Sequence, residues 1–152
     1  MVVRNYKPED SANVKNFVLS ILEKEYPFDR SAYQDSDIYD ITGTYSGRGN
    51  GFFVIEGNGK IAGVLGIKKD DSSSALVRRL FVGEDYRKKG LGTILLEKAI
   101  EFCKENNYEE IVFKATGRMR EAMKLCKTMG FEEKEDLEVS GFHIHKFVLK
   151  LK

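Results

Sequence analysis

The chain has no tryptophan, only two prolines and two cysteines, and no long hydrophobic run. Because Cys103 and Cys126 lack the paired spacing of a metal site, we interpret them as reduced thiols of a cytoplasmic protein. Arg4 stands almost at the start and no long apolar run follows it, so neither a signal peptide nor a membrane span is expected. The net charge of +1 gives no reason to expect nucleic acid or a membrane as partner.

What is present suits one globular domain over residues 1–152. Hydrophobic residues make up 41% of the chain and charged residues 32%, which is ordinary for a globular protein. Apolar spacing and turn residues predict the following order. The expected elements are a strand at 2–6, a helix from 8 to 27, a short helix around 38–41, a hairpin at 51–69, a strand at 75–82, a helix at 90–106, a strand at 110–115, a helix at 118–129, and strands at 131–137 and 142–151.

This order predicts an α/β (α+β) fold with one mixed, mostly antiparallel sheet of about seven strands and helices on both faces. Asn58 and Gly59 between two β-rich runs indicate a hairpin turn. The one crossover comes after residue 82, where strand, helix and strand follow each other. Gly130 is the expected cap of the helix at 118–129. Residues 28–50 give the weakest signal.

The clearest functional signal is the segment 75–93, in which an apolar strand turns into a glycine-rich loop and then a helix. The loop reads Arg-Lys-Lys-Gly-Leu-Gly over residues 87–92. Glycine permits close approach of a ligand, and the first turn of a helix offers unpaired N–H groups in a field that favours anions. With three cations upstream, the loop predicts a cradle for a pyrophosphate rather than a metal site.

Two familiar phosphate motifs do not match this loop. No glycine is followed by Lys and Ser or Thr in the frame of a P-loop. The dinucleotide fingerprint requires a third glycine where Leu95 stands. A plain turn that starts a helix therefore stays an alternative for Gly90 and Gly92 when they are taken by themselves.

Strand, Arg-x-x-Gly-x-Gly and long helix together resemble the acyl-coenzyme A site of the GNAT superfamily of N-acyltransferases. A second segment, residues 122–131, is similar to the family's Ala-x-x-Leu-Tyr-x-x-x-Gly-Phe. Two motifs in the right order are much more specific than one, and the resemblance covers nearly the whole chain except the weak part at 28–50. It implies the GNAT acyltransferase fold and acetyl-coenzyme A as cosubstrate.

The resemblance also implies roles for particular residues. Backbone groups of Leu80, Phe81 and Val82 are expected to bind the pantetheine arm, with the Val82 N–H polarising the thioester carbonyl. The expected pyrophosphate site comprises Arg87, Lys88, Lys89, Gly90, Leu91, Gly92 and Thr93. Candidates for the adenosine 3′-phosphate are Arg118, Arg120, Lys124 and Lys127, although cations on a helix usually form only its solvated face. No metal site is predicted.

The implied reaction is direct attack of an amine on the thioester, and the sequence departs from the family at the positions that usually assist it. Cys126 replaces the Tyr thought to protonate the leaving thiolate, Met119 replaces an Asn, and Leu76 replaces a Glu. A coenzyme A thiol of pKa ~8.5 leaves with modest help, so activity does not require the acid. Cys126 is thus either a proton donor or a packing residue, and a covalent role is not expected.

Two further groups are candidates on the acceptor side. Six acids between residues 23 and 40, among them Glu25, Asp29 and Asp37, predict an acidic rim for a cationic amine, with a merely solvated surface as alternative. His143 and His145 alternate along the last strand and therefore face the same side. They are either a proton acceptor or ordinary exposed histidines.

The sequence thus predicts an N-acyltransferase that moves an acetyl group from acetyl-coenzyme A to a primary amine of a small molecule or peptide. The alternative is a coenzyme A-binding sensor or interaction module with weak or no catalysis. We expect a monomer or homodimer without nucleic acid or membrane.

Overall fold

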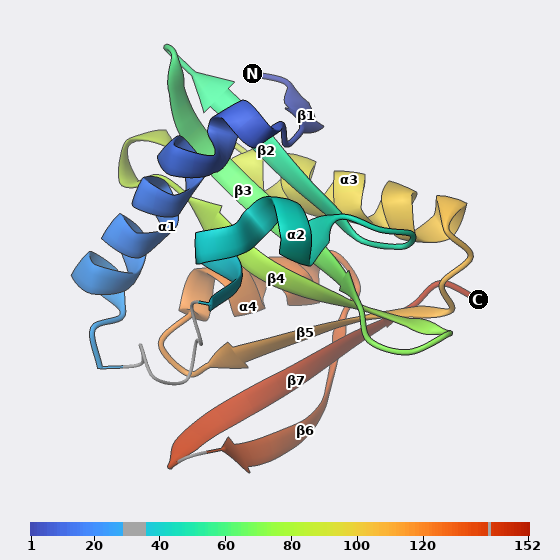
Figure 1. The fold of residues 1–152 in the computed structure, drawn as a ribbon. Coiled ribbons are helices and arrows are strands. Elements are labelled where there is room, and N and C mark those ends of the chain that lie inside the picture. Colours follow the sequence, from blue (N-terminus) through green and yellow to red (C-terminus); the bar gives the residue numbers. More distant parts are fainter. Residues whose placement is uncertain (29–35, 140) are drawn as a thin grey trace.

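The computed structural model describes residues 1–28, 36–139 and 141–152 (Figure 1). In these ranges the helices are α1 (Ser11–Glu25), α2 (Ile41–Tyr45), α3 (Leu91–Glu105) and α4 (Arg120–Thr128). The strands are β1 (Val3–Asn5), β2 (Gly51–Gly57), β3 (Lys60–Lys69), β4 (Ser74–Val82), β5 (Glu110–Thr116), β6 (Glu132–Val139) and β7 (Phe142–Lys150). Short 3-10 turns lie at Pro8–Asp10, Ser36–Asp40 and Glu84–Tyr86. None of the helices described combines the length and the apolar character needed to cross a bilayer.

The strands form one sheet in the order β1-β2-β3-β4-β5-β7-β6. Neighbouring strands are antiparallel except β4 and β5, which are parallel and joined through α3. A parallel pair needs such a crossover, whereas Asn58 and Gly59, both at positive φ, turn β2 into β3 within two residues. The predicted mixed, mostly antiparallel sheet and its crossover after residue 82 are confirmed. The expectation that this is the one crossover is wrong, because β5, α4 and β6 make a second one, with β7 lying between the two strands.

Helices cover both faces of the sheet, as predicted (Figure 1). A Cβ added to Gly63 of β3 would lie 3.1 Å from Leu95 of α3, whereas one added to Gly66 would lie 2.7 Å from Tyr45 of α2. Since odd and even positions of a strand face opposite sides, α3 packs on one face and α2 on the other. Glycines at these two positions let the helices approach the strand closely.

The helix predicted at 118–129 begins two residues later, at Arg120, because Met119 has a non-helical conformation with φ −85° and ψ 55°. It ends as expected, since Gly130 has φ +100° and its N–H donates to the carbonyl of Lys127 at 3.1 Å. The left-handed region suits glycine at this position.

A β-bulge in β4 sets the direction of its last residues. Phe81 pairs with Val64 and Arg78 with Gly66, so that Arg79 and Leu80 together oppose Leu65. Arg79 accordingly has φ +57°, a conformation uncommon for a side chain of its size. The extra residue bends the strand and turns the Arg79 side chain inward.

The inward guanidinium of Arg79 makes a buried ion pair with Asp37. Its Nε donates to Oδ2 at 3.0 Å and its Nη2 to Oδ1 at 2.6 Å, and only 4% of each side chain is exposed. The Tyr45 hydroxyl donates to the same carboxylate at 2.7 Å. The expectation that Asp37 lies on an acidic rim is therefore wrong, because the bulge brings a cation into the core that needs this carboxylate as partner.

Burial alone would raise the pKa of the Asp37 carboxyl, but the hydrogen bonds and charge of Arg79 outweigh burial and hold it below its ordinary value. A lowered folded-state pKa stabilises the protein fully above the unfolded pKa, and this contribution is lost as pH falls through the folded value.

We expect Asp37→Ala to lower the free energy of unfolding by about 3–5 kcal/mol, because Arg79 stays buried without this carboxylate. The stability of the variant should also change less than that of the wild type below about pH 4. Urea unfolding at several pH values measures both effects. Asp85→Ala, at an exposed carboxylate, serves as control, and an equal effect in both variants would contradict the role assigned to the pair.

Candidate functional site

Strands β4 and β5 pair along only part of their length. The four pairs run from Ser74–Glu110 to Val77–Phe113, whereas β4 continues to Val82 and β5 to Thr116 (Figure 1). The bulge at Arg79 begins two residues after the last pair. Residues 78–82 therefore form a strand that is paired with β3 on one side and has left β5 on the other.

The backbone at the end of β4 presents a donor to the side where β5 has parted. The Gly83 N–H donates to the carbonyl of Ala62 in β3 at 2.8 Å. Successive N–H groups of a strand point in opposite directions, so the Val82 N–H points away from β3. The Val82 carbonyl points the same way and accepts a hydrogen bond from Arg87 Nε at 3.0 Å.

Arg87, expected at the pyrophosphate, uses its guanidinium to connect other parts of the fold. Besides the bond to Val82, its Nη2 donates to Glu25 on α1 at 2.6 Å. This carboxylate raises the pKa of Arg87. The pair ties the loop after β4 to the end of α1, and it removes Glu25 from the acidic rim that the sequence predicted.

The loop between Arg87 and α3 has the backbone shape of an anion nest. Lys88 and Gly90 both have positive φ, at +62° and +81°. Gly90 is the N-cap of α3 and lacks a side chain that could accept from the first N–H groups, and the first bond of the helix runs from the Ile94 N–H to the Gly90 carbonyl at 3.1 Å. The N–H groups of Leu91, Gly92 and Thr93 are thus the donors at this helix end.

The two glycines of this loop serve different needs. A Cβ on Gly90 would meet nothing within 4 Å, so its left-handed conformation is the reason for glycine. A Cβ on Gly92 would lie 2.8 Å from Leu125 Cδ2 of α4. The second glycine therefore permits α3 and α4 to pack, which the sequence analysis did not anticipate.

The three cations on α4 face away from this loop. Because Leu125 faces α3, the opposite side of α4 carries Arg120, Lys124 and Lys127. These three line a hollow of about 400 Å³ together with Glu133 and His145. The Arg118 guanidinium lies over the Phe28 ring at 5.4 Å. This arrangement argues against Arg120, Lys124 and Lys127 as ligands of a 3′-phosphate at the loop.

Cys126 lies in the core, with no exposed surface. Burial raises the pKa of its thiol to about 12. A thiol of this pKa does not readily protonate a thiolate of pKa ~8.5, and at neutral pH it is not a nucleophile. The packing interpretation of Cys126 therefore has more support than the proton-donor interpretation, and Cys103 is equally buried with the same raised pKa.

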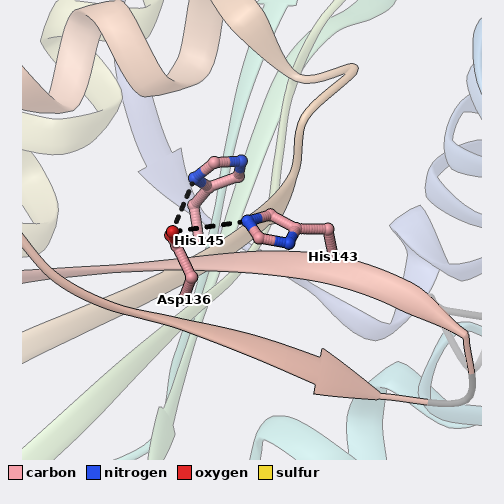
Figure 2. A group of neighbouring side chains, drawn as sticks. All are labelled: Asp136, His143 and His145. Carbon is pink, nitrogen blue, oxygen red and sulfur yellow. Dashed lines mark ion pairs between the residues drawn. The ribbon is translucent and has the colours of Figure 1, made fainter.

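The other acceptor-side candidates are dispersed in the fold. Asp40 caps α2 by accepting from the Gly43 N–H at 3.0 Å. Asp29 and Asp35 lie outside the described residues. His143 and His145 do share one face, as the alternation predicted, and their ring centroids are 4.8 Å apart (Figure 2).

Sequence reasoning missed the two ion pairs that hold this region, Arg79–Asp37 and Arg87–Glu25. A signal for the first was available, since adjacent Arg78 and Arg79 interrupt an otherwise apolar strand. In a strand covered on both faces, two neighbouring cations require either a buried partner or a bulge, and the structure has both.

Two similar proteins are both named as N-acetyltransferases. The chain is 30% identical over 104 residues to human N-acetyltransferase 8, covering 64% of this chain and 46% of the human protein. It is 35% identical over 92 residues to an uncharacterized N-acetyltransferase of Methanocaldococcus jannaschii, covering 57% and 41%. The chain thus matches less than half the length of these relatives.

Solved structures show the same fold. A GNAT acetyltransferase from Staphylococcus aureus superimposes with a TM-score of 0.85 at 24% identity, covering 99% of this chain and 98% of the other. The protein yncA of Salmonella typhimurium, solved with its cofactor acetyl-CoA, has a TM-score of 0.78 at 18% identity, covering 100% and 94%.

The family profile covers most of the sequence. The Acetyltransferase (GNAT) family matches residues 15–131, a range that begins in α1 and includes β4, the loop and α3, and ends directly after α4. Both the loop motif and the second segment of the sequence analysis lie inside it. The chain therefore belongs to the GNAT acetyltransferase family.

Proposed function

We propose that this chain is an N-acetyltransferase that moves the acetyl group of acetyl-coenzyme A to a primary amine by direct attack in a ternary complex. The observation that carries this proposal is the end of β4, which leaves β5 after Val77 and is followed, after the 3-10 turn Glu84–Tyr86, by the nest at residues 88–93. Family membership and the acetyl-CoA complex of yncA support the choice of cosubstrate.

In this proposal the main chain does most of the binding. The N–H groups of the nest and of the first turn of α3 hold the pyrophosphate, with Lys88 and Lys89 adding positive charge. Within the segment Leu80, Phe81 and Val82, the backbone groups that point away from β3 pair with the pantetheine amides on the side that β5 has left. Backbone recognition agrees with the apolar side chains at these positions, which remain free to pack in the core.

When bound, acetyl-coenzyme A supplies an activated thioester. The Val82 N–H, which points away from β3, is our candidate for stabilising the negative charge that develops on the carbonyl oxygen. The hydrogen bond from Arg87 to the Val82 carbonyl fixes the next peptide group along the chain, between Val82 and Gly83. The thiolate leaves without a side-chain acid, because its pKa of ~8.5 makes it a tolerable leaving group near neutral pH.

The acceptor is proposed only as a small-molecule or peptide amine. Relatives such as zebrafish N-acetylaspartate synthetase, 31% identical over 111 residues, are named for amine acetylation products, but the chain covers only 39% of that protein. A cytoplasmic location and a monomeric or homodimeric state also stay predictions.

We expect Lys88→Glu to weaken acetyl-coenzyme A binding at least ~10-fold, because it places a like charge beside the pyrophosphate. Calorimetric titration measures this loss. Lys104→Glu makes the same charge change at the far end of α3 and should bind as the wild type does. Unchanged affinity in Lys88→Glu would move the pyrophosphate away from this loop. A bulky residue at Gly92 would test only helix packing, because Leu125 occupies that space.

Cys126→Ala should keep turnover within ~3-fold of the wild type, because a buried thiol with a pKa of about 12 is a poor proton donor. Steady-state release of free coenzyme A measures this. Cys103→Ala is the matched control, since that thiol is equally buried on α3 and has the same raised pKa. A loss of ~100-fold in Cys126→Ala alone would restore the proton-donor role.

The alternative, a coenzyme A-binding module without catalysis, is favoured by one observation: a buried thiol stands where the family's second segment has Tyr. A panel of amines separates the two proposals. Thiol release that depends on an added amine supports the enzyme, whereas tight binding of acetyl-coenzyme A without turnover for any amine supports the module.

A further inference from the structure

Both histidines of the chain lie together at the edge of the sheet. The sequence contains two histidines, and the rings of His143 and His145 are 4.8 Å apart at an angle of 66°. Both come from β7, and Figure 2 shows both rings turned toward Asp136 of β6. The carboxylates of Glu133 and Glu138 are also within hydrogen-bonding distance of these rings.

Strand register explains why these side chains share a face. His145 pairs directly with Asp136, and His143 with Glu138, so each imidazole has a carboxylate as its cross-strand neighbour. A bulge between Glu133 and Glu135 shifts the alternation of β6 by one residue. Glu133 therefore faces the same side as Asp136, although the two are three positions apart.

Two pairs of donor atoms have separations typical of a metal site. Asp136 Oδ2 lies 3.4 Å from His143 Nε2, and Asp136 Oδ1 lies 3.2 Å from His145 Nδ1. One donor atom from each residue can be chosen so that all three lie within 4.8 Å of one another. Around a tetrahedral ion with bonds of about 2.0–2.1 Å, neighbouring donors are about 3.3 Å apart.

We propose that Asp136, His143 and His145, with Glu133 as a fourth donor, bind one divalent transition-metal ion of the Zn²⁺ type. Glu133 Oε2 lies 2.7 Å from His145 Nδ1 and has to move outward by about half an ångström to reach a tetrahedral position. Such a movement is small for an exposed glutamate. The sequence analysis predicted no metal site, because spacing along the chain does not show four donors assembled across two strands.

The surrounding groups orient the ligands. Glu138 Oε1 lies 3.1 Å from His143 Nδ1. With an ion bound, Glu138 can accept the Nδ1 proton of His143, which leaves the Nε2 lone pair for the metal. A carboxylate behind a histidine ligand is the usual arrangement at zinc sites. His145 would coordinate through Nδ1, which without the ion donates to Glu133 Oε2 at 2.7 Å. Binding therefore displaces the Nδ1 proton and leaves the neutral ring protonated on Nε2.

The mixed imidazole and carboxylate donors select the kind of ion. Two nitrogen donors suit Zn²⁺, Co²⁺ or Ni²⁺, whereas Ca²⁺ and Mg²⁺ prefer oxygen donors alone. Both thiols of the chain are buried away from the surface and do not compete. The ion would connect β6, the last strand of the sheet, to β7.

The ion would also lie beside α4. His145 and Glu133 line the hollow that Arg120, Lys124 and Lys127 line from the helix, and Lys127 Nζ is 4.0 Å from Glu133. A bound cation would compete with Lys127 for Glu133, and it would join β6 to β7 without a ligand from the helix. The inference does not depend on the proposed acetyl transfer, so either can fail without the other.

The test uses the full chain without a histidine tag, freed of metal by a chelator. Titration with ZnCl₂ should show one ion bound per chain with a dissociation constant of about 10 µM or tighter, and none with CaCl₂ or MgCl₂. The apparent Tm should rise by at least about 5 °C when the ZnCl₂ concentration is about a hundred times that dissociation constant. Because the chain has two histidines, a ¹H–¹⁵N spectrum of the imidazoles should show both rings changing, His143 at Nε2 and His145 at Nδ1.

His143→Gln and Asp136→Asn should each weaken Zn²⁺ binding at least ~30-fold. Glu135→Gln is the matched control, because this exposed carboxylate of β6 faces the other side of the strand and pairs with Lys146 at 3.4 Å. The proposal would be overturned if the wild type bound no Zn²⁺ at a ZnCl₂ concentration of about 1 mM. It would also be overturned if wild type and His143→Gln bound Zn²⁺ with equal affinity. Imidazole signals that stay unchanged in the Zn²⁺-bound protein would overturn it as well.

Discussion

The buried ion pair between Asp37 and Arg79 fixes the part of the fold on which the candidate site depends. Arg79 is the extra residue of a bulge in β4, and its buried inward side chain requires a carboxylate as partner. The segment containing Asp37 is held against the sheet in return. Because a buried charge without its partner is costly, the bulge and this segment are formed together or not at all.

The bulge lies just before the part of β4 whose backbone groups point to the side that β5 has left. After Val77 the strand no longer pairs with β5, and the Val82 N–H points to that open side. The Arg87 side chain then joins Val82 to Glu25 of α1. The end of β4 is thus connected through Arg87 to α1, which is distant in sequence, and a defined orientation of donors is what acyl transfer requires.

The two glycines of the loop motif have different roles, one in binding and one in the packing of α3 against α4. Gly90 provides the left-handed turn that starts α3 and exposes its first N–H groups, whereas Gly92 provides room for Leu125. Cys126, on the same helix as Leu125, is fully buried, and its raised pKa follows from the loss of water around the thiol. The short thiol suits a tightly packed position, and this is consistent with a reaction in which the leaving group needs no side-chain acid.

The sequence by itself determined the elements and their order, the crossover after residue 82, the turn at Asn58, the helix start at Gly90 and the cap at Gly130, because each depends on neighbouring residues and on local backbone preferences. Only the tertiary structure decided that Asp37 is buried, that Gly92 faces Leu125, and that Glu133 joins Asp136 and the two histidines. The physical reason is that these depend on bulges and on contacts between distant segments. A bulge shifts the strand alternation by one residue and so reverses which side chains face inward.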